Sequence, residues 1–186
     1  MLTGRYPQSR FVGCKPQLLL LLLAMAITAA CGPAVRTPST VRATDLDDED
    51  YRLIWPLPII TTARITSVFG RRKHPITGMQ RFHSGIDLDG QTGDPVYAAG
   101  AGKVVFSGER SGYGKLIIID HGRGLTTYYG HCSRLLKTRG EIVNRGTIVA
   151  RIGSTGQSTG SHLHFETRKH GRQFDPLLVL PKLKKL

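Results

Sequence analysis

Residues 95–131 read "PVYAAGAGKVVFSGERSGYGKLIIIDHGRGLTTYYGH", and they contain runs of β-branched and aromatic residues separated by glycines. Valine, isoleucine, tyrosine and phenylalanine favour strands, and glycine marks the turns between them. Similar runs occur on both sides: "ITSVFG" and "GIDLDG" before, "IVNRGTIVARIG" and "HLHFETR" after. No helical period persists for more than two turns. The sequence therefore predicts an all-β fold of antiparallel sheets stacked as a sandwich, with short glycine-rich turns.

The segment "STGSHLHFETR", residues 158–168, alternates polar and apolar residues. On a strand, side chains two residues apart share a face. His162, His164 and Glu166 would then point one way, and Leu163 and Phe165 the other. Taken alone, this pattern fits half of a metal site or a solvated edge strand equally well, because short motifs often match by chance.

A second motif, H-x-x-x-D, places His83 and Asp87 in "FHSGIDLDG". A straight strand would separate their Cα atoms by about 13 Å, whereas zinc ligand atoms each lie about 2 Å from the metal. Gly85 between them is where the chain could bend so that both side chains converge. Taken alone, the motif also fits an ordinary hydrogen-bonded turn.

The two motifs together supply histidine and carboxylate ligands suited to Zn²⁺. Three protein ligands with one open position are typical of a catalytic zinc site, whereas structural sites are closed and usually rich in cysteine. His131, in "YYGHCS", is a candidate for proton transfer. The remaining histidines are expected at the surface or in supporting positions: His74, His121 and His170.

The N-terminus predicts export. A basic start is followed by an uncharged run, Leu18–Ala30, which is shorter than the about 20 residues that span a bilayer but suits a signal peptide. The stretch "ITAAC" resembles a bacterial lipobox, which predicts lipidation of Cys31. The alternative is an ordinary signal that is cleaved, for example, after "AMA" at residues 24–26.

These features divide the chain into a signal peptide at 1–30, a flexible linker at 31–54, a folded domain at 55–176 and a basic tail at 177–186. From Tyr51 onward, 21 Lys and Arg face 8 Asp and Glu. Such a charge favours anionic polymers or surfaces. For an exported protein, cell-wall polymers and phospholipid headgroups are expected rather than nucleic acid. Cys132 is the one cysteine left for the domain, so no internal disulfide is expected.

The order of the motifs resembles a known family. H-x-x-x-D, then "YYGH", then "GTIVARIGSTGQSTGSHLHFE" is similar to the lysostaphin/LytM-type zinc endopeptidases of peptidoglycan. The resemblance runs from about Val68 to Arg168 and includes nearly all of the predicted domain. It implies that the chain adopts that family's β fold and acts on the bacterial cell wall.

The resemblance also implies roles for individual residues. One zinc ion per chain would be held by His83, Asp87 and His164, and His131 and His162 would be the two catalytic histidines outside the metal shell. Zinc lowers the pKa of a bound water and polarises a carbonyl, while the two histidines would move protons and stabilise the oxyanion. The positions of Arg71 and Tyr113 imply residues that line the substrate groove. Cys132 could be an additional ligand, although a small buried side chain is the expected role.

The function indicated is a zinc-dependent endopeptidase, a hydrolase of peptidoglycan cross-links that acts as a monomer. A non-enzymatic activator of a wall amidase and a structural wall-binding lipoprotein are the alternatives. The enzyme is favoured because the positions of the three zinc ligands and the two catalytic histidines are all filled. Gly32 after Cys31 indicates a lipid anchor in the outer membrane facing the periplasm, where related enzymes cut D-Ala to diaminopimelate bonds.

Overall fold

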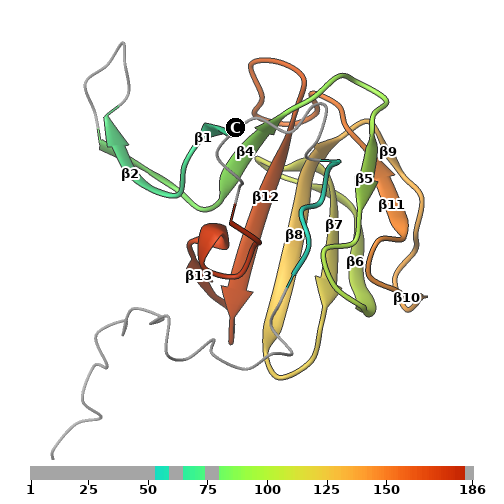
Figure 1. Ribbon diagram of the computed structural model, residues 1–186. Coiled ribbons are helices and arrows are strands. Elements are labelled where there is room, and N and C mark those ends of the chain that lie inside the picture. Colours follow the sequence, from blue (N-terminus) through green and yellow to red (C-terminus); the bar gives the residue numbers. More distant parts are fainter. Residues whose placement is uncertain (1–52, 59–64, 74–79, 183–186) are drawn as a thin grey trace, which may run out of the picture. The chain divides into compact units, whose positions relative to one another are not determined.

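The computed structural model describes residues 53–58, 65–73 and 80–182, and these residues form the antiparallel β fold that the sequence predicts (Figure 1). Within these ranges there is no α-helix, and one short 3₁₀ helix occurs at Pro176–Leu178. No helix among them is long and apolar enough to cross a membrane. The predicted signal peptide, Cys31 and His74 lie outside the described residues.

The largest sheet has the strand order β1-β4-β12-β8-β7-β6-β10, with β13 paired to β12. A second sheet has the order β5-β11-β9, and β2 and β3 form a separate two-stranded ribbon. All of these pairs are antiparallel. The strand bounds are β1 Ile65–Ser67, β2 Gly70–Lys73, β3 Gln80–His83, β4 Ile86–Asp89, β5 Pro95–Tyr97, β6 Gly102–Arg110, β7 Gly114–Asp120, β8 Leu125–Cys132, β9 Arg134–Leu135, β10 Ile142–Val143, β11 Ile148–Arg151, β12 His162–Lys169 and β13 Arg172–Phe174.

The glycines of the quoted stretch make its turns possible. Gly112 lies between β6 and β7 with a φ angle of 81°, and Gly114 begins β7 with a φ of 63°. Gly122 and Gly124 lie between β7 and β8 with φ of 83° and 79°. A Cβ atom disfavours this left-handed region, so glycine is the residue that adopts it most readily. The turns hold β6, β7 and β8 as consecutive neighbours in the sheet.

One hydrophobic cluster joins the two larger sheets. Side chains of β4, β7, β8 and β12 pack with those of β5 and β11, and the largest fully buried members include Tyr129, Phe165, Ile86, Leu88, Ile117 and Leu163. The alternation on β12 is therefore as expected, with Leu163 and Phe165 on the core side. Because β12 pairs with β4 on one side and β8 on the other, it is not the edge strand that its motif alone allowed.

The packed region extends beyond the expected bounds of 55–176. Leu53 is buried, and Trp55 donates a hydrogen bond from Nε1 to the carbonyl of Pro181 at 3.0 Å. Val179 and Leu180 are also buried in the core. The start of the predicted tail is thus part of the domain, because the apolar residues of the tail pack in the same core as the segment around Trp55.

Candidate metal centre and active site

Three strands bring His83, Asp87 and His164 together at one end of the large sheet. His83 ends β3, Asp87 lies on β4, and His164 on β12 is the register partner of Asp87. The strand is interrupted between the first two, as the H-x-x-x-D spacing required, with a bend at Gly85. A Cβ at Gly85 would overlap with the carbonyl oxygen of Phe165, so only glycine lets this bend approach β12 so closely.

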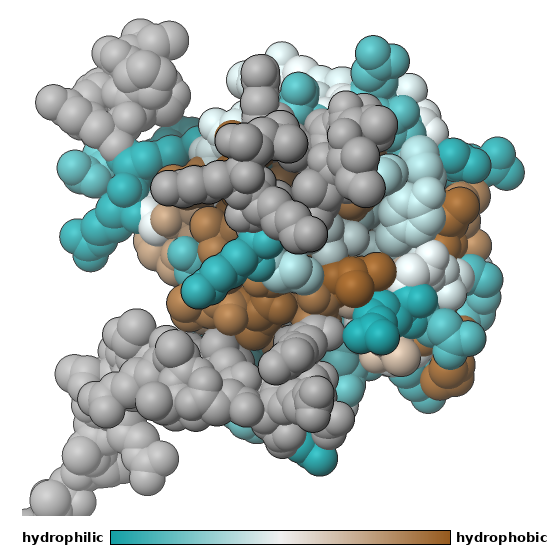
Figure 2. Space-filling model, viewed as in Figure 1, coloured by the Kyte–Doolittle hydropathy of each residue, from teal (hydrophilic) through white to brown (hydrophobic). Residues whose placement is uncertain are grey.

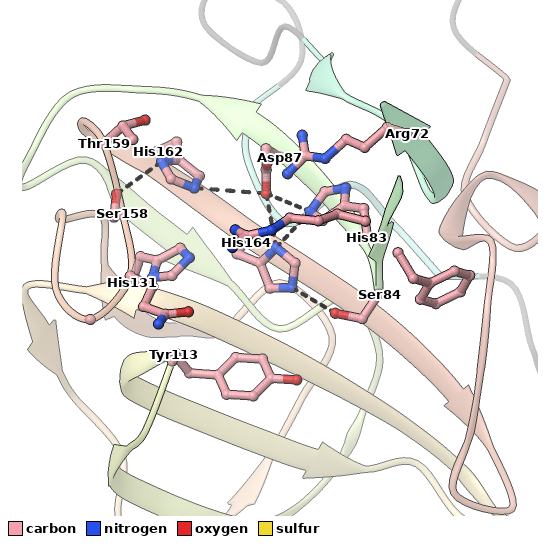
Figure 3. A pocket seen from close by; sticks show the side chains of 15 residues that line it. Arg72, His83, Ser84, Asp87, Tyr113, His131, Ser158, Thr159, His162 and His164 are labelled. Atoms are coloured by element: carbon pink, nitrogen blue, oxygen red, sulfur yellow. Dashed lines mark hydrogen bonds and ion pairs between the residues drawn. The ribbon is translucent and has the colours of Figure 1, made fainter. Parts of the chain in front are cut away.

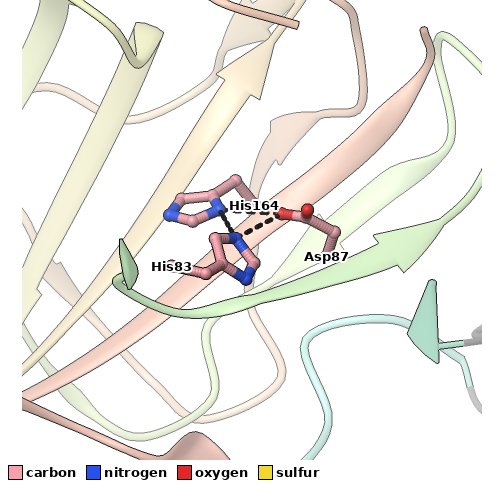
Figure 4. Close-up of side chains that lie close together, drawn as sticks. All are labelled: His83, Asp87 and His164. Carbon is pink, nitrogen blue, oxygen red and sulfur yellow. Dashed lines mark hydrogen bonds and ion pairs between the residues drawn. The ribbon is translucent and has the colours of Figure 1, made fainter. Parts of the chain in front are cut away.

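The three side chains point one ligand atom each toward a common centre (Figure 4). His83 Nε2 lies 3.1 Å from Asp87 Oδ1 and 3.2 Å from His164 Nδ1, and His164 Nδ1 lies 2.8 Å from Asp87 Oδ1. Ligand atoms about 2.0–2.1 Å from a tetrahedral zinc ion lie about 3.3 Å apart. The triangle is therefore close to the size that zinc requires, and its chemistry of two imidazoles and one carboxylate fits that metal.

In the neutral form of each ring, the hydrogen bond on its far side assigns the proton to the nitrogen that faces away from Asp87. His83 Nδ1 lies 2.8 Å from the carbonyl of Val68, and His164 Nε2 lies 3.0 Å from Oε1 of Glu166. A carbonyl and a carboxylate can only accept, so in each neutral ring these nitrogens carry the proton. The lone pairs of His83 Nε2 and His164 Nδ1 then face Asp87, and three acceptors converge where a cation would satisfy all of them.

The electrostatics of the cluster agree with this geometry. Burial raises the pKa of Asp87, but the close contacts with His164 and His83 outweigh burial and hold the pKa well below its usual range. Burial lowers the pKa of His164, but hydrogen bonds to Asp87 and Glu166 raise it by more. Without a metal, the cluster thus attracts a proton to His164, which indicates a site with strong affinity for positive charge.

Glu166 contacts the metal-ligand cluster through His164 and is fully buried. Its Oε1 accepts hydrogen bonds from His164, from the Ser84 hydroxyl and, at 2.7 Å, from the Tyr113 hydroxyl. Its Oε2 accepts two from Arg168, at 2.9 and 2.6 Å. These bonds lower the pKa of Glu166 although burial by itself raises it. The sequence pattern placed Glu166 on the correct face but did not reveal Ser84 or Arg168.

His131 and His162 lie beside the cluster and outside its three ligands (Figure 3). Their ring centroids are 4.8 Å apart. His131 Nδ1 donates to the carbonyl of Thr155 at 2.7 Å, and His162 Nδ1 to that of Gly160 at 2.9 Å. The Nε2 atom of each neutral ring is therefore the free acceptor, and His162 Nε2 lies 3.7 Å from Asp87 Oδ1.

The backbone at His131 adopts a conformation that is uncommon outside glycine. Its φ angle is 60°, while its amide still donates to the carbonyl of Tyr113 at 2.8 Å. Such strain is often found at functional sites. Burial lowers the pKa of His131, which keeps the ring neutral and able to accept a proton at neutral pH.

The two residues that flank His131 have structural roles. Gly130 is the register partner of His164, and a Cβ there would lie 3.2 Å from the ring of Tyr113, which is closer than an ordinary contact. Cys132 lies in the hydrophobic core, and burial raises the pKa of its thiol to about 12. Among the described residues, the metal-ligating cluster does not include this cysteine.

A pocket of about 740 Å³ surrounds these groups. Tyr113 lines it, and the Tyr113 hydroxyl donates a hydrogen bond to Glu166. Arg71 is exposed and is not among the lining residues, whereas its neighbour Arg72 and the cross-strand Arg81 are. Sequence reasoning missed this pair, because their inward direction depends on how the β2–β3 ribbon folds over the site.

Two other histidines lie away from the pocket. His121 contacts the carbonyl of Ala101 and the hydroxyl of Thr127, each at 2.8 Å, and His170 is exposed on the turn between β12 and β13. Neither lines the pocket, in agreement with the supporting or surface positions expected for them.

Residues 81–176 match peptidase family M23, and the chain belongs to that family. DD-carboxypeptidase/endopeptidase Mpg of Neisseria meningitidis is 42% identical over 138 residues, which cover 71% of this chain and 32% of that protein. Peptidoglycan DD-endopeptidase ShyB of Vibrio cholerae is 39% identical over 125 residues, covering 66% and 29%. The lipoprotein NlpD/LppB homolog of Pseudomonas aeruginosa is 46% identical over 101 residues, covering 54% and 34%. The chain thus spans about a third of the length of these relatives.

Solved structures show the same fold. A zinc-containing peptidase from Vibrio cholerae superposes with a TM-score of 0.63 and 36% identity, covering 70% of this chain and 40% of that one. The catalytic domain of lysostaphin from Staphylococcus simulans has a TM-score of 0.56 and 30% identity, covering 62% and 90%. The predicted resemblance to lysostaphin-type peptidases is confirmed.

Proposed function

We propose that the chain is a zinc-dependent endopeptidase that hydrolyses the peptide cross-links of bacterial peptidoglycan. The observation that carries the proposal is the convergence of His83 Nε2, Asp87 Oδ1 and His164 Nδ1 within 4.8 Å of one another in a pocket. Membership of family M23 and the similarity to DD-endopeptidases support the reaction class. D-Ala to diaminopimelate bonds are the cross-links proposed.

In this proposal, the three convergent residues hold one zinc ion, which supplies Lewis acidity and a lowered pKa of bound water. His131 and His162 contribute their Nε2 atoms. One of the pair accepts a proton from the attacking water and passes it to the leaving amine, and the other, in its protonated form, donates a hydrogen bond from Nε2 to the oxyanion. Glu166 keeps His164 in the tautomer and orientation that ligation needs.

We further propose that the protein is exported as a monomer and anchored by lipid at Cys31 in the outer membrane, facing the periplasm. The support is the lipobox-like "ITAAC" together with similarity to proteins named as lipoproteins, including uncharacterized lipoprotein YgeR of Escherichia coli. Mass spectrometry of the N-terminal peptide tests the anchor: a diacylglyceryl cysteine at position 31 is expected, and a free N-terminus near residue 27 would indicate ordinary cleavage.

One experiment distinguishes the enzyme from the alternative, a non-enzymatic activator of an amidase. The similarity to the NlpD/LppB homolog is the reason to test this alternative. The purified full chain is loaded with one equivalent of zinc and incubated with isolated sacculi. Mass spectrometry should show cross-linked muropeptides converted to monomers, and His164→Ala should abolish the conversion. Intact cross-links combined with stimulation of an added amidase would instead establish the activator.

A further inference from the structure

The β2–β3 ribbon places two arginines directly opposite each other. Arg72 on β2 is the register partner of Arg81 on β3, and both side chains are exposed. Like charges in such a cross-strand position are unfavourable. The ribbon pairs with neither of the other sheets, so no third strand stabilises it against the repulsion between the two arginines. Figure 2 shows hydrophilic surface where the ribbon projects at the left of the view.

Both arginines line the pocket that contains the metal-ligand cluster. Figure 3 shows Arg72 extending over the side where His83 and Asp87 lie. Arg72 donates one hydrogen bond from Nη1 to the Ser67 hydroxyl, which leaves its other guanidinium donors available. Within the described ranges, Arg81 has no ion-pair partner.

The charge of the pocket is unbalanced. Asp87 is the only carboxylate among the described residues that line it, and its Oδ1 is already engaged by His83 and His164. The lining therefore presents two guanidinium groups and one carboxylate, an excess of positive charge next to the position where a peptide bond would be cut. A guanidinium group binds a carboxylate through paired, charge-assisted hydrogen bonds.

We propose that Arg72 and Arg81 bind a free carboxylate of the substrate on a residue that flanks the scissile bond. The inference rests on the proposed endopeptidase activity and defines its substrate class: an anionic cross-link peptide rather than a neutral bridge such as oligoglycine. The bound carboxylate removes the cross-strand repulsion and orients the peptide beside the cluster. Arg72 and Arg81 thereby determine specificity without touching the reacting atoms.

Two synthetic cross-link peptides test the proposal, identical except that the flanking carboxylate is free in one and amidated in the other. The zinc-loaded full chain should cleave the acid form with a kcat/KM about 10-fold higher, the size typical of a charge-assisted hydrogen bond. In Arg72→Gln and in Arg81→Gln, this acid-to-amide ratio should fall toward one. Arg145→Gln removes the same charge from an exposed turn outside the pocket and should keep the ratio.

Binding measurements separate this inference from the proposed activity. Calorimetry with the full-length His131→Ala variant should give tighter binding of the acid peptide than of the amide, and the preference should disappear when Arg72→Gln is added. If neither peptide is cleaved, the proposed activity fails while this binding preference still decides the inference. Equal kcat/KM for both peptides, equal binding, or an unchanged ratio in both arginine variants would overturn it.

Discussion

His164 and Glu166 lie on the same face of β12, and the Nε2 atom of His164 is 3.0 Å from the carboxylate of Glu166. This contact turns the Nδ1 atom of His164 toward Asp87, 2.8 Å away. The carboxylate of Glu166 thus determines which nitrogen of the His164 ring can bind a metal. Arg168, with two hydrogen bonds to Oε2, keeps that carboxylate ionised and in place.

We expect Glu166→Gln to lower zinc affinity by about 10–100-fold, the cost typical of losing such an outer carboxylate. The amide retains the shape of the side chain but no longer balances Arg168 or fixes the tautomer of His164. Chelator competition measures the affinity, and circular dichroism checks the fold. Glu109→Gln, an exposed carboxylate on β6, is the matched control. An unchanged zinc affinity in Glu166→Gln would contradict the role assigned to the contact.

His131→Ala and His162→Ala should each retain close to one zinc per chain and lower kcat by about 10²–10⁴-fold, because the proposed mechanism gives these rings proton transfer and oxyanion stabilisation rather than metal binding. Metal analysis and muropeptide release are measured on the same preparation. His170→Ala, at an exposed turn, should match the wild type in both. Loss of zinc from His131→Ala or His162→Ala would place that histidine among the ligands instead.

Gly85→Ala should lower the free energy of unfolding by about 1–3 kcal/mol, the usual cost of overpacking. The new methyl group would meet the backbone of Phe165, which cannot move without displacing β12. Gly160→Ala is the control, since a Cβ there has no neighbour within 4 Å and the effect should stay within about 0.5 kcal/mol. Urea unfolding of both variants gives the comparison, and equal losses would refute the steric explanation.

His121 should make stability depend on pH. Burial lowers its pKa in the folded state, only partly offset by the hydrogen bond to Ala101. Between that lowered pKa and about 6.5, the value for an unfolded chain, the unfolded state binds more protons. Its contribution is therefore complete above about pH 6.5 and is lost as the pH falls toward the folded-state pKa.

The measurement compares urea unfolding of the wild type and His121→Gln at several pH values from 8 to 5. The difference in unfolding free energy should shrink as the pH falls. His170→Gln, at an exposed turn, is the matched control for replacing a histidine. A pH-independent difference for His121→Gln would mean that this ring does not carry the effect.

The sequence by itself determined the fold class, and the order of its motifs indicated the candidate metal ligands through the resemblance to a known family. Alternation in "HLHFE" separates the two faces of β12 whatever the neighbours are, and glycines between strand-forming runs require turns. H-x-x-x-D alone fitted an ordinary turn as well, because a straight strand cannot bring both side chains to one ion, and the order of the motifs favoured a ligand pair. These are local properties of the chain, and they do not depend on its tertiary contacts.

Only the tertiary structure decided what surrounds that centre. Arg168 reaches Glu166 from the same strand, but Ser84 and Tyr113 reach it from distant positions in the sequence. Arg72 and Arg81 become a pair only when β2 and β3 align in register beside the pocket. Local patterns specify which face a side chain takes, whereas contacts between distant segments depend on sheet order and register, which are set by the packing of the whole core.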